Sequence, residues 1–231
     1  MFTIITVNFN NKEGLERSIN SFISQDYVEK ELIIVDGGST DGSLEVIKEY
    51  NQHIDQIVVD EDEGIYDAMN IGLGLASDHS TFIHFLNSGD VFCNQNVLNK
   101  VYKSALQFNG HIYGDVKRNG VIIGSAPTIN YRTMSGDMIC HQAIFFNTKI
   151  HKQVLYDTSY SICADYKMIL EFIKSSVPFK KIELVICTIE LGGISSVRRK
   201  KLHEEKNSIR KKYPKLLFYT YLKRMKRLIT V

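Results

Sequence analysis

The chain has 231 residues, 44% of them hydrophobic, which is enough for one large domain with a full core or for a domain with an appendage. Its four cysteines are widely spaced without a Cys-x-x-Cys pair, so the sequence indicates neither a zinc knuckle nor a disulfide framework and favours buried thiols in a reducing cytoplasm. No basic segment precedes the first strand-like run, and no apolar run approaches the ~20 residues that span a bilayer, so we expect neither a secretory signal nor a membrane-spanning helix.

The net charge of +2 conceals two regions of opposite sign. Residues 1–197 contain 15 Lys and Arg against 24 Asp and Glu, whereas residues 198–231 contain 13 against 2. An acidic body is therefore followed by a basic tail. Residues 1–197 show no internal repeat and no low-complexity linker, so we interpret them as one domain and 198–231 as a separate tail.

The first part of the chain alternates strand and helix patterns. Apolar runs predict buried strands at Phe2–Val7, Leu32–Val35, Ile57–Val59 and Phe82–Leu86. Asn11 is a candidate N-cap for the helix after the first strand. Ser39, Thr40 or Asp41 is the candidate N-cap for the next helix, which carries Leu44 and Ile47. A third helix begins near Ile65. Repeated strand–helix–strand units predict an α/β fold with right-handed crossovers and a mostly parallel sheet.

The pattern changes after a helix predicted near Gln95–Phe108. Asn119-Gly120 lies between two apolar runs, and this dipeptide suits the type I′ turn of a hairpin. Further along the chain we expect a strand at Ala143–Phe146, a helix at Tyr166–Ile173 and a strand at Lys181–Ile189.

Acidic residues follow three of the predicted strands. Asp36, the Asp60–Asp62 cluster and Asp90 each come directly after an apolar run. An aspartate at a strand end is often only a turn former. In an open α/β sheet, however, ligands bind outside the carboxyl ends of the strands, and three acidic ends at one edge favour a binding site there.

A phosphate-bearing ligand can bind at such an acidic edge only if a cation lies between the two negative charges. The sequence has no Gly-x-x-x-x-Gly-Lys loop, and Gly72-x-Gly74 lies inside a predicted helix, where it indicates packing and not a dinucleotide site. Carboxylates hold a diphosphate only through a metal ion, and Mg²⁺ typically uses one or two carboxylates plus phosphate oxygens. The residues therefore predict a metal-dependent nucleotide-diphosphate site.

Several motifs, in this order and spacing, resemble those of family 2 glycosyltransferases, which have the GT-A fold. They are Thr6–Asn10, Ile34–Ser43, Asp62–Asn70 and Leu86–Asp90. The resemblance covers roughly residues 1–195. The form Gly-Ile-Tyr-Asp-Ala-Met-Asn at 64–70 looks most like the bacterial group that builds capsule, O-antigen and colanic-acid repeat units.

The resemblance implies roles for residues on the donor side. Asp36 would contact the base or ribose, with Thr6, Val7 and Asn8 lining the base pocket. Asp90 matches the last acid of the metal motif, so the cofactor would be Mn²⁺ or Mg²⁺, and Asn87 stands where many relatives carry Asp. The other donor positions are Asn10, Gly38, Ser39, Asp62, Gly64, Tyr66, Asp67, Asn70, Ser88 and Gly89. For Asp62 and Asp67, capping and solvent-facing roles remain open.

On the acceptor side, Asp165 matches the catalytic base of the family, with a helix N-cap as the alternative. His141 and Gln142 resemble a segment near the acceptor, although His141 also fits a structural hydrogen-bonded histidine. The stretch 192–199 resembles a loop that closes over the donor. Its candidate contacts are Ser195, Arg198 and Arg199, and the alternative is that the arginines belong only to the basic tail.

Together these features predict a metal-dependent inverting glycosyltransferase. It would move one sugar from a nucleotide sugar, UDP-linked in our expectation, to a lipid-linked oligosaccharide for a surface polysaccharide. Two alternatives are a sugar-1-phosphate nucleotidyltransferase, which needs a Gly-rich phosphate loop, and a non-catalytic module that binds a membrane or polyanion through its tail.

The tail carries an apolar stripe between basic residues. Phe218, Leu222, Met225 and Ile229 recur at helical spacing, which is typical of a helix lying in a lipid interface. We expect this helix to hold the enzyme peripherally on the anionic inner face of the membrane. The alternative is that the stripe packs on the body or on a second subunit of a homodimer. No nucleic-acid partner is expected, because the acidic body repels phosphates.

Overall fold

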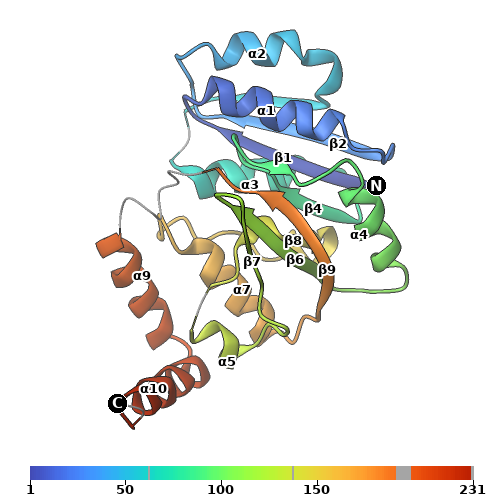
Figure 1. Cartoon of the computed structure of the whole chain (residues 1–231). Coiled ribbons are helices and arrows are strands. Elements are labelled where there is room, and N and C mark those ends of the chain that lie inside the picture. The colour runs from blue at the N-terminus through green and yellow to red at the C-terminus, as the bar shows by residue number, and fades with distance from the viewer. Residues whose placement is uncertain (62, 137, 191–198, 230–231) are drawn as a thin grey trace.

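The computed structural model describes residues 1–61, 63–136, 138–190 and 199–229 (Figure 1). The strands are β1 (Phe2–Asn8), β2 (Lys30–Asp36), β3 (Gln56–Val59), β4 (Phe82–Phe85), β5 (Val91–Phe92), β6 (His111–Arg118), β7 (Val121–Ile123), β8 (Ile144–Asn147) and β9 (Phe179–Thr188). The helices are α1 (Lys12–Ile23), α2 (Ser43–Glu49), α3 (Ile65–Leu75), α4 (Val97–Ala105), α5 (Tyr131–Met134), α6 (Thr148–His151), α7 (Ala164–Lys174), α9 (Arg199–Lys211) and α10 (Pro214–Ile229), with 3₁₀ turns η1 (Asn51–His53) and η2 (His141–Ala143).

The N-terminal half of the sheet is parallel, as the alternating pattern predicts. Its strand order is β3-β2-β1-β4, and all three pairings are parallel. In the register of β1 and β2, Asn8 lies opposite Asp36, and Asp36 in turn lies opposite Val59 of β3. The carboxyl ends of these strands therefore form one edge, which carries the polar residues that follow each apolar run.

The C-terminal half makes the sheet mixed. Strand β8 pairs antiparallel with β4 and β6, β9 runs parallel to β6, and β5 pairs antiparallel with β9. The expected hairpin is confirmed between β6 and β7, where Asn119 and Gly120 have φ of 51° and 76° as a type I′ turn requires. The mostly parallel arrangement thus holds for the first four strands of the order, and the later strands add the antiparallel pairs.

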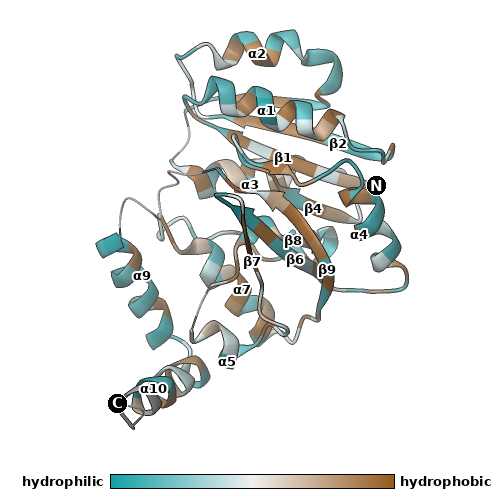
Figure 2. Cartoon of the chain, viewed as in Figure 1, coloured by the Kyte–Doolittle hydropathy of each residue, from teal (hydrophilic) through white to brown (hydrophobic). Residues whose placement is uncertain are grey.

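The core lies between the sheet and the helices that cover it, and its strands are the most apolar part of the chain (Figure 2). Helix α3 packs directly on β1 and β2. A Cβ on Gly72 would lie 2.5 Å from Cγ2 of Ile5, so only glycine permits this close approach. The interpretation of Gly72 as a helix-packing residue is therefore confirmed.

The helix caps follow the expectations in part. Asn11 caps α1, and its side chain accepts the N–H of Gly14. The cap predicted for α2 is wrong: the N-cap is Gly42, whose φ of 95° favours glycine, while Asp41 accepts hydrogen bonds from Ser43. Asp165 is not the N-cap of α7 either, because that position belongs to Cys163.

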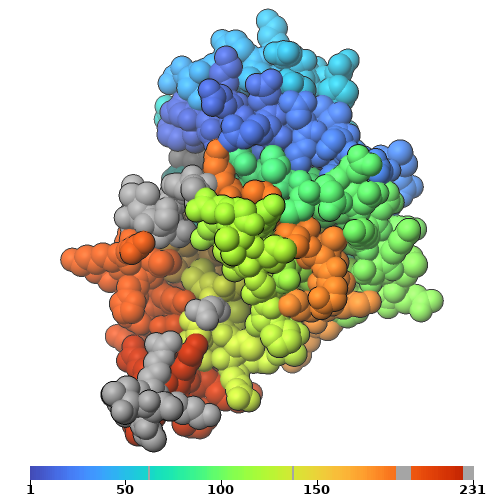
Figure 3. Space-filling view, viewed as in Figure 1, coloured from blue at the N-terminus to red at the C-terminus, as the bar shows by residue number. Residues whose placement is uncertain are grey.

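The two C-terminal helices lie at one corner of the molecule beside the segment that contains α5 (Figure 3). Ile209, Tyr213 and Leu216 belong to the buried core, so one face of the tail packs on the body. Three residues of the predicted stripe lie outside this buried contact: Phe218 is 58% exposed, Leu222 40% and Met225 39%. Among the described residues, no helix is long and apolar enough to cross a membrane.

Three buried histidines make the fold sensitive to acid. Burial lowers the pKa of His84 from 6.5 to about 3, that of His151 to about 4, and that of His111 well below 6.5. Between the folded values and 6.5 these histidines bind more protons in the unfolded chain than in the folded one. Their contribution to stability is therefore complete above pH 6.5 and falls as the pH drops toward 4, by roughly 1.4 kcal/mol per pH unit for each histidine.

We predict that His151→Phe flattens this acid dependence. Phe carries no titratable group and suits the aromatic surroundings of His151, whose ring lies 4.7 Å from that of Phe146. The measurement is the free energy of unfolding in urea at pH 7 and pH 5. His79→Phe, at an exposed histidine, is the matched control and should leave the wild-type difference intact. A His151→Phe protein that loses as much stability as wild type would contradict the prediction.

Candidate active site

A long open cleft lies along the polar edge of the sheet. Its volume of about 2180 Å³ exceeds the roughly 300–1,000 Å³ of a pocket for one small ligand, so two substrates can bind side by side. One wall comes from the ends of β1, β4 and β9, and the other from α5, η2 and the start of α7. Residues of α9 and α10 line it as well.

Asp90 brings a buried carboxylate into this cleft. It is 3% exposed and follows Gly89, whose φ of 97° permits the tight turn after β4. Its Oδ1 accepts the backbone N–H of Glu190 at 2.9 Å, and its Oδ2 accepts Nε2 of Gln142 at 3.0 Å. Among the described residues, no Lys or Arg forms an ion pair with it. Burial raises its pKa from 3.8 to about 6, although the two hydrogen bonds oppose the shift.

Gln142 is held in place by a thiol. Cys140 Sγ donates to Oε1 of Gln142 at 2.6 Å, which directs the Nε2 end of the amide toward Asp90. Burial raises the pKa of the Cys140 thiol to about 12, so it stays protonated and remains a donor. Gln142 therefore stabilises Asp90 through a neutral contact and supplies no positive charge.

Asp165 lies on the opposite wall, at the second residue of α7. It is 7% exposed. Its Oδ1 accepts the N–H of Tyr166 at 2.7 Å and lies 3.2 Å from the hydroxyl of Tyr66, and its Oδ2 accepts Nδ1–H of His141 at 3.2 Å. Burial, and then the charge of Asp165, raise the pKa of Tyr66 well above 10, so the phenol keeps its proton. Three groups thus hold the carboxylate in a defined orientation.

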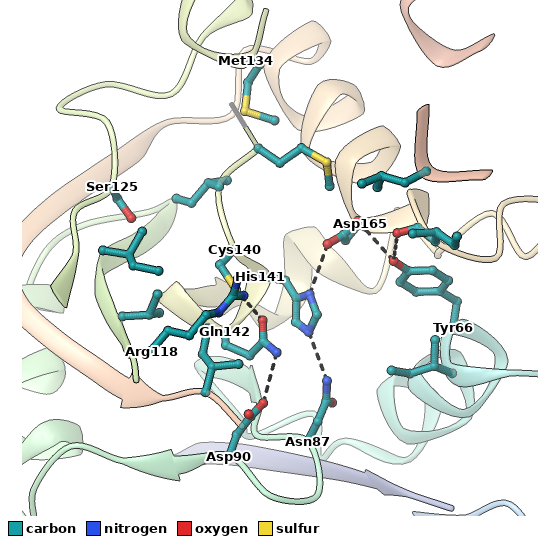
Figure 4. A pocket seen from close by; sticks show the side chains of 18 of the residues that line it. Tyr66, Asn87, Asp90, Arg118, Ser125, Met134, Cys140, His141, Gln142 and Asp165 are labelled. Atoms are coloured by element: carbon teal, nitrogen blue, oxygen red, sulfur yellow. Dashed lines mark hydrogen bonds and ion pairs between the residues drawn. The ribbon is translucent and has the colours of Figure 1, made fainter. Parts of the chain in front are cut away.

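His141 links the two walls (Figure 4). Its Nδ1 faces Asp165, and its Nε2 lies 3.3 Å from Nδ2 of Asn87, in the turn that leads to Asp90. The Asn87 amide donates to Nε2, which assigns the proton of a neutral ring to Nδ1. Oδ1 of Asn87 is buried without a hydrogen-bond partner among the described residues. His141 and Asn87 therefore connect the surroundings of the two carboxylates.

Asp36 has a different environment from Asp90 although both end a strand. It is fully buried, its Oδ1 accepts the N–H of Ser39 at 2.7 Å, and its Oδ2 accepts from the Ser39 hydroxyl and from Nδ2 of Asn8. Ser39 Oγ in turn accepts the N–H of Asn10 at 2.8 Å. These bonds join the ends of β1 and β2 and shape the loop after β2, and Asp36 itself does not line the cleft.

The structure brings many of the predicted site residues together. Those that line the cleft are Val7, Asn8, Gly64, Tyr66, Asn87, Ser88, Asp90, His141, Gln142, Asp165 and Arg199. Those that lie outside its lining are Thr6, Asn10, Asp36, Gly38, Ser39, Asp67, Asn70 and Gly89. Asp62, Ser195 and Arg198, with most of the predicted closing loop at 192–199, lie outside the described residues.

Several predicted donor residues make structural contacts instead of facing the cleft. Asp67 accepts the N–H of Glu63 at 3.2 Å, which is the capping contact left open as its alternative role. The amide of Asn70 forms two hydrogen bonds with the backbone of Tyr156, both at 2.9 Å, and so ties α3 to the segment before α7.

The cleft also contains residues that the sequence did not indicate. Basic side chains of Arg118, Arg132 and Lys223 line it, from β6, α5 and α10. Glu190 lies beside Asp90 and forms an ion pair with Arg17 of α1. No local pattern marks these positions, because each comes from a different element that only the tertiary structure brings to the cleft. The sequence placed Lys223 among the basic residues of the tail and did not indicate that it lines the cleft.

Solved glycosyltransferase structures share this fold. S. aureus TarS 1–349 in complex with UDP-GlcNAc matches with a TM-score of 0.71 at 16% identity over 84% of this chain and 60% of that chain. The mannosyltransferase PcManGT from Pyrobaculum calidifontis, in complex with GDP-Man and Mn²⁺, gives 0.64 at 16% identity over 84% and 57%. The chain thus spans about 60% of the TarS chain. The expected GT-A fold is confirmed.

The fold and the cleft define a glycosyltransferase. Residues 3–173 match the sequence pattern of glycosyl transferase family 2, and the chain belongs to this family. A PGL/p-HBAD biosynthesis glycosyltransferase of Mycobacterium bovis is 29% identical over 206 residues, which cover 85% of this chain and 79% of that protein. The minor teichoic acid biosynthesis protein GgaA of Bacillus subtilis is 38% identical over 109 residues, 44% of this chain and 24% of that protein. The chain is therefore a glycosyltransferase and not a nucleotidyltransferase or a non-catalytic module.

The buried charge of Asp90 lowers the stability of the ligand-free protein. Its folded pKa of about 6 lies above the unfolded value of 3.8, so this carboxyl favours folding below pH 3.8 and loses that contribution as the pH rises through 6. The amide of Asn replaces one of the two oxygens that accept N–H groups, and this loss is the same at every pH. We therefore predict that the free energy of unfolding of Asp90→Asn, which stays neutral, rises relative to wild type by about 3 kcal/mol between pH 4 and pH 8.

The measurement is thermal and urea unfolding at pH 8 and pH 4 without nucleotide or metal. This relative gain should be absent at pH 4, where the carboxyl of Asp90 is protonated in the folded protein. Asp60→Asn, at an exposed acid, is the matched control and should change little at either pH. An Asp90→Asn protein whose stability relative to wild type is the same at pH 4 and pH 8 would contradict the prediction.

Proposed function

We propose that this glycosyltransferase moves one sugar, with inversion at its anomeric carbon, from a UDP-linked nucleotide sugar to a lipid-linked oligosaccharide. The observation that carries the proposal is a pair of carboxylates on opposite walls of one cleft. Asp90 is buried and has no cationic partner among the described residues, and Asp165 is oriented by Tyr166 and His141. The first suits a site for a cation and diphosphate, the second a general base.

Asp165 takes the proton in this mechanism. An acceptor hydroxyl beside Asp165 gives its proton to the carboxylate as the hydroxyl oxygen bonds to the anomeric carbon. The bond between that carbon and the diphosphate oxygen breaks on the opposite side, and the nucleoside diphosphate leaves with the electron pair. The ring N–H of His141 and the backbone N–H of Tyr166 keep the carboxylate in position, because they donate to its two oxygens.

The residues around Asp90 fit a divalent cation. The carboxylate has oxygen lone pairs beyond its two hydrogen bonds, its charge lacks a cationic partner in the described residues, and its pKa is raised by burial. Among those residues no cluster of three or more His, Cys, Asp or Glu surrounds a metal position, which matches a Mn²⁺ or Mg²⁺ site completed by substrate phosphates. When bound, the metal neutralises charge on the leaving diphosphate. Arg118 is the nearby residue that we assign to the same diphosphate.

The donor side of the cleft supports a nucleotide. Asn8 lines the cleft, and its Oδ1 is buried without a hydrogen-bond partner among the described residues. Such an atom costs free energy until it accepts a hydrogen bond, and ribose or base N–H and O–H groups are suitable donors. Asp36 acts indirectly in this proposal, since it holds Asn8. The TarS complex with UDP-GlcNAc supports a UDP-linked donor.

The surface of the tail supports a lipid-linked acceptor. Tyr219, Leu222 and Lys223 of α10 line the cleft, while Phe218 and Tyr221 of the same helix are exposed. An anionic inner membrane surface would take up the exposed apolar face between the basic residues. The acceptor sugar would then enter the cleft beside α10 while its lipid stays in the membrane. The teichoic acid name of the Bacillus relative supports a biosynthetic role of this kind.

We predict that Asp165→Asn lowers sugar transfer by about 10²–10⁴-fold and leaves donor binding nearly intact, because an amide cannot take the proton. The assay is metal-dependent release of nucleoside diphosphate from a panel of UDP-sugars and GDP-mannose, with donor binding measured by thermal shift. Asp90→Asn is the reciprocal control and should lose the metal-dependent thermal shift. Asp78→Asn, at an exposed acid, should match wild type in both. Wild-type rates in the Asp165→Asn protein would show that Asp165 is not the base.

We predict that the double variant Phe218→Glu, Tyr221→Glu loses binding to phosphatidylglycerol vesicles, because charge on the exposed face of α10 opposes insertion. The measurement is cosedimentation at low and high salt. Leu155→Glu, at an apolar residue of the body that is 59% exposed, is the matched control and should sediment like wild type. If the double variant sediments as wild type does, or wild type fails to sediment, α10 is not the membrane contact.

A further inference from the structure

Glu205 of α9 is a buried carboxylate that no motif marks. It is 9% exposed, and both of its oxygens are occupied. Oε1 accepts the N–H and the hydroxyl of Ser161 at 3.0 and 3.1 Å, and Oε2 accepts the N–H groups of Ile162 and Cys163, both at 3.0 Å. These four hydrogen bonds reach a segment more than 40 residues earlier in the sequence. Four bonds to one carboxylate over three consecutive residues fix the path of that segment.

The segment held by Glu205 enters helix α7. Its N-cap, Cys163, makes no side-chain capping bond, so the chain lacks a local cap where the helix begins. A carboxylate near a helix N-terminus is favoured by the helix dipole, and here α9 supplies it from a distant part of the sequence. The first turn that follows contains Asp165.

One chain of contacts leads from Glu205 to the base. Ile162 donates its N–H to Glu205 and accepts the Tyr66 hydroxyl with its carbonyl at 2.7 Å. The same hydroxyl lies 3.2 Å from Oδ1 of Asp165. A shift of the Ile162 peptide therefore moves Tyr66 and Asp165 together. Ser161 and Ile162 also line the cleft, so the shift would alter its wall.

Further contacts of α9 keep Glu205 in register with α7. Nη2 of Arg210 donates to the carbonyl of Ser135 at 3.1 Å, and Nζ of Lys206 lies 5.3 Å from the ring centroid of Tyr166. Tyr166 follows Asp165 and donates its hydroxyl to the carbonyl of Met134 at 2.8 Å. Helix α9 thus contacts the ring of Tyr166 and the carbonyl of Ser135, next to the Met134 carbonyl that Tyr166 bonds.

We propose that Glu205 is a positioning residue for Asp165, so that the first helix of the tail completes the active site. This inference rests on the proposed role of Asp165 as the base. Glu205 touches no substrate: it fixes the peptide from 161 to 163, which fixes Tyr66 and the start of α7. A role in anchoring α9 alone would change the stability and leave the rate of the folded enzyme unaltered.

The test compares Glu205→Gln with wild type as full-length chains. Gln keeps the shape but loses the charge and replaces one acceptor oxygen by an amide that repels the N–H groups of Ile162 and Cys163. UDP-GlcNAc and Mn²⁺ are the probes, and UDP release is measured well below the melting temperature. We expect kcat to fall about 10- to 100-fold, because small displacements of a catalytic group have effects of this size. KM for the donor should change less than about twofold, because the Asp90 wall is not involved.

Three further measurements make the outcome decisive. Glu204→Gln, on the exposed face of the same helix, is the matched control and should keep wild-type kcat. Amide hydrogen exchange at Ile162 and Cys163 should accelerate in Glu205→Gln and not in Glu204→Gln. Glu205→Asp, which keeps the charge on a shorter side chain, should fall between Glu205→Gln and wild type in kcat.

If wild type releases UDP and a folded Glu205→Gln protein has the same kcat, the positioning role is overturned and the proposed function stays intact. A wild type that releases no UDP would overturn the use of this donor and the positioning role with it. Failure of both Glu205 variants to fold would also count against the proposal, because Glu205 would then be a determinant of folding.

Discussion

The site depends on the burial of one carboxylate that has no cationic partner in the part of the chain that the structure describes. Asp90 is held by the N–H of Glu190 and the amide of Gln142, and burial raises its pKa to about 6. Ser18 of α1 accepts the N–H of Gly89 and donates to the carbonyl of Asp90, which fixes the turn after β4. Three separate segments thus hold in place a charge that is unfavourable in the empty protein, and the proposed cation would offset it.

The two walls of the cleft come from different halves of the sheet. The parallel half delivers Asn8 and Asp90 to the donor side, because parallel strands end at one edge. The mixed half and its helices deliver His141 and Asp165 to the other side. His141 contacts Asp165 with one nitrogen and Asn87 with the other, so the position of the base is tied to the turn that carries Asp90. This connection relates the geometry of proton transfer to that of donor binding.

The tail has two different faces. One packs on the body through Ile209, Tyr213 and Leu216, and its Glu205 reaches the segment before α7. The other exposes apolar residues of α10 beside the open cleft. One face of this helix pair thus holds the segment before Asp165, and the other leaves an apolar surface exposed at the mouth of the cleft.

The sequence by itself predicted those features that depend on local patterns. Apolar runs and turn residues are sufficient to identify the parallel strands, the Asn119-Gly120 hairpin and the acidic strand ends, because side-chain period and turn conformation are set by neighbouring residues. The resemblance to family 2 glycosyltransferases implied that Asp90, His141 and Asp165 belong to one site, and all three line the cleft.

The tertiary structure decided which of these acids face the cleft. Asp36 and Asp90 follow similar strands, but Asn8 and Ser39 occupy the carboxylate of Asp36, while that of Asp90 faces the cleft. Glu205 and Arg118 were not predicted, since their partners lie in distant segments and no local period records such contacts. Hydrogen bonds between residues far apart in sequence exist only once the elements are packed, and for this reason only the fold determines how each polar side chain is used.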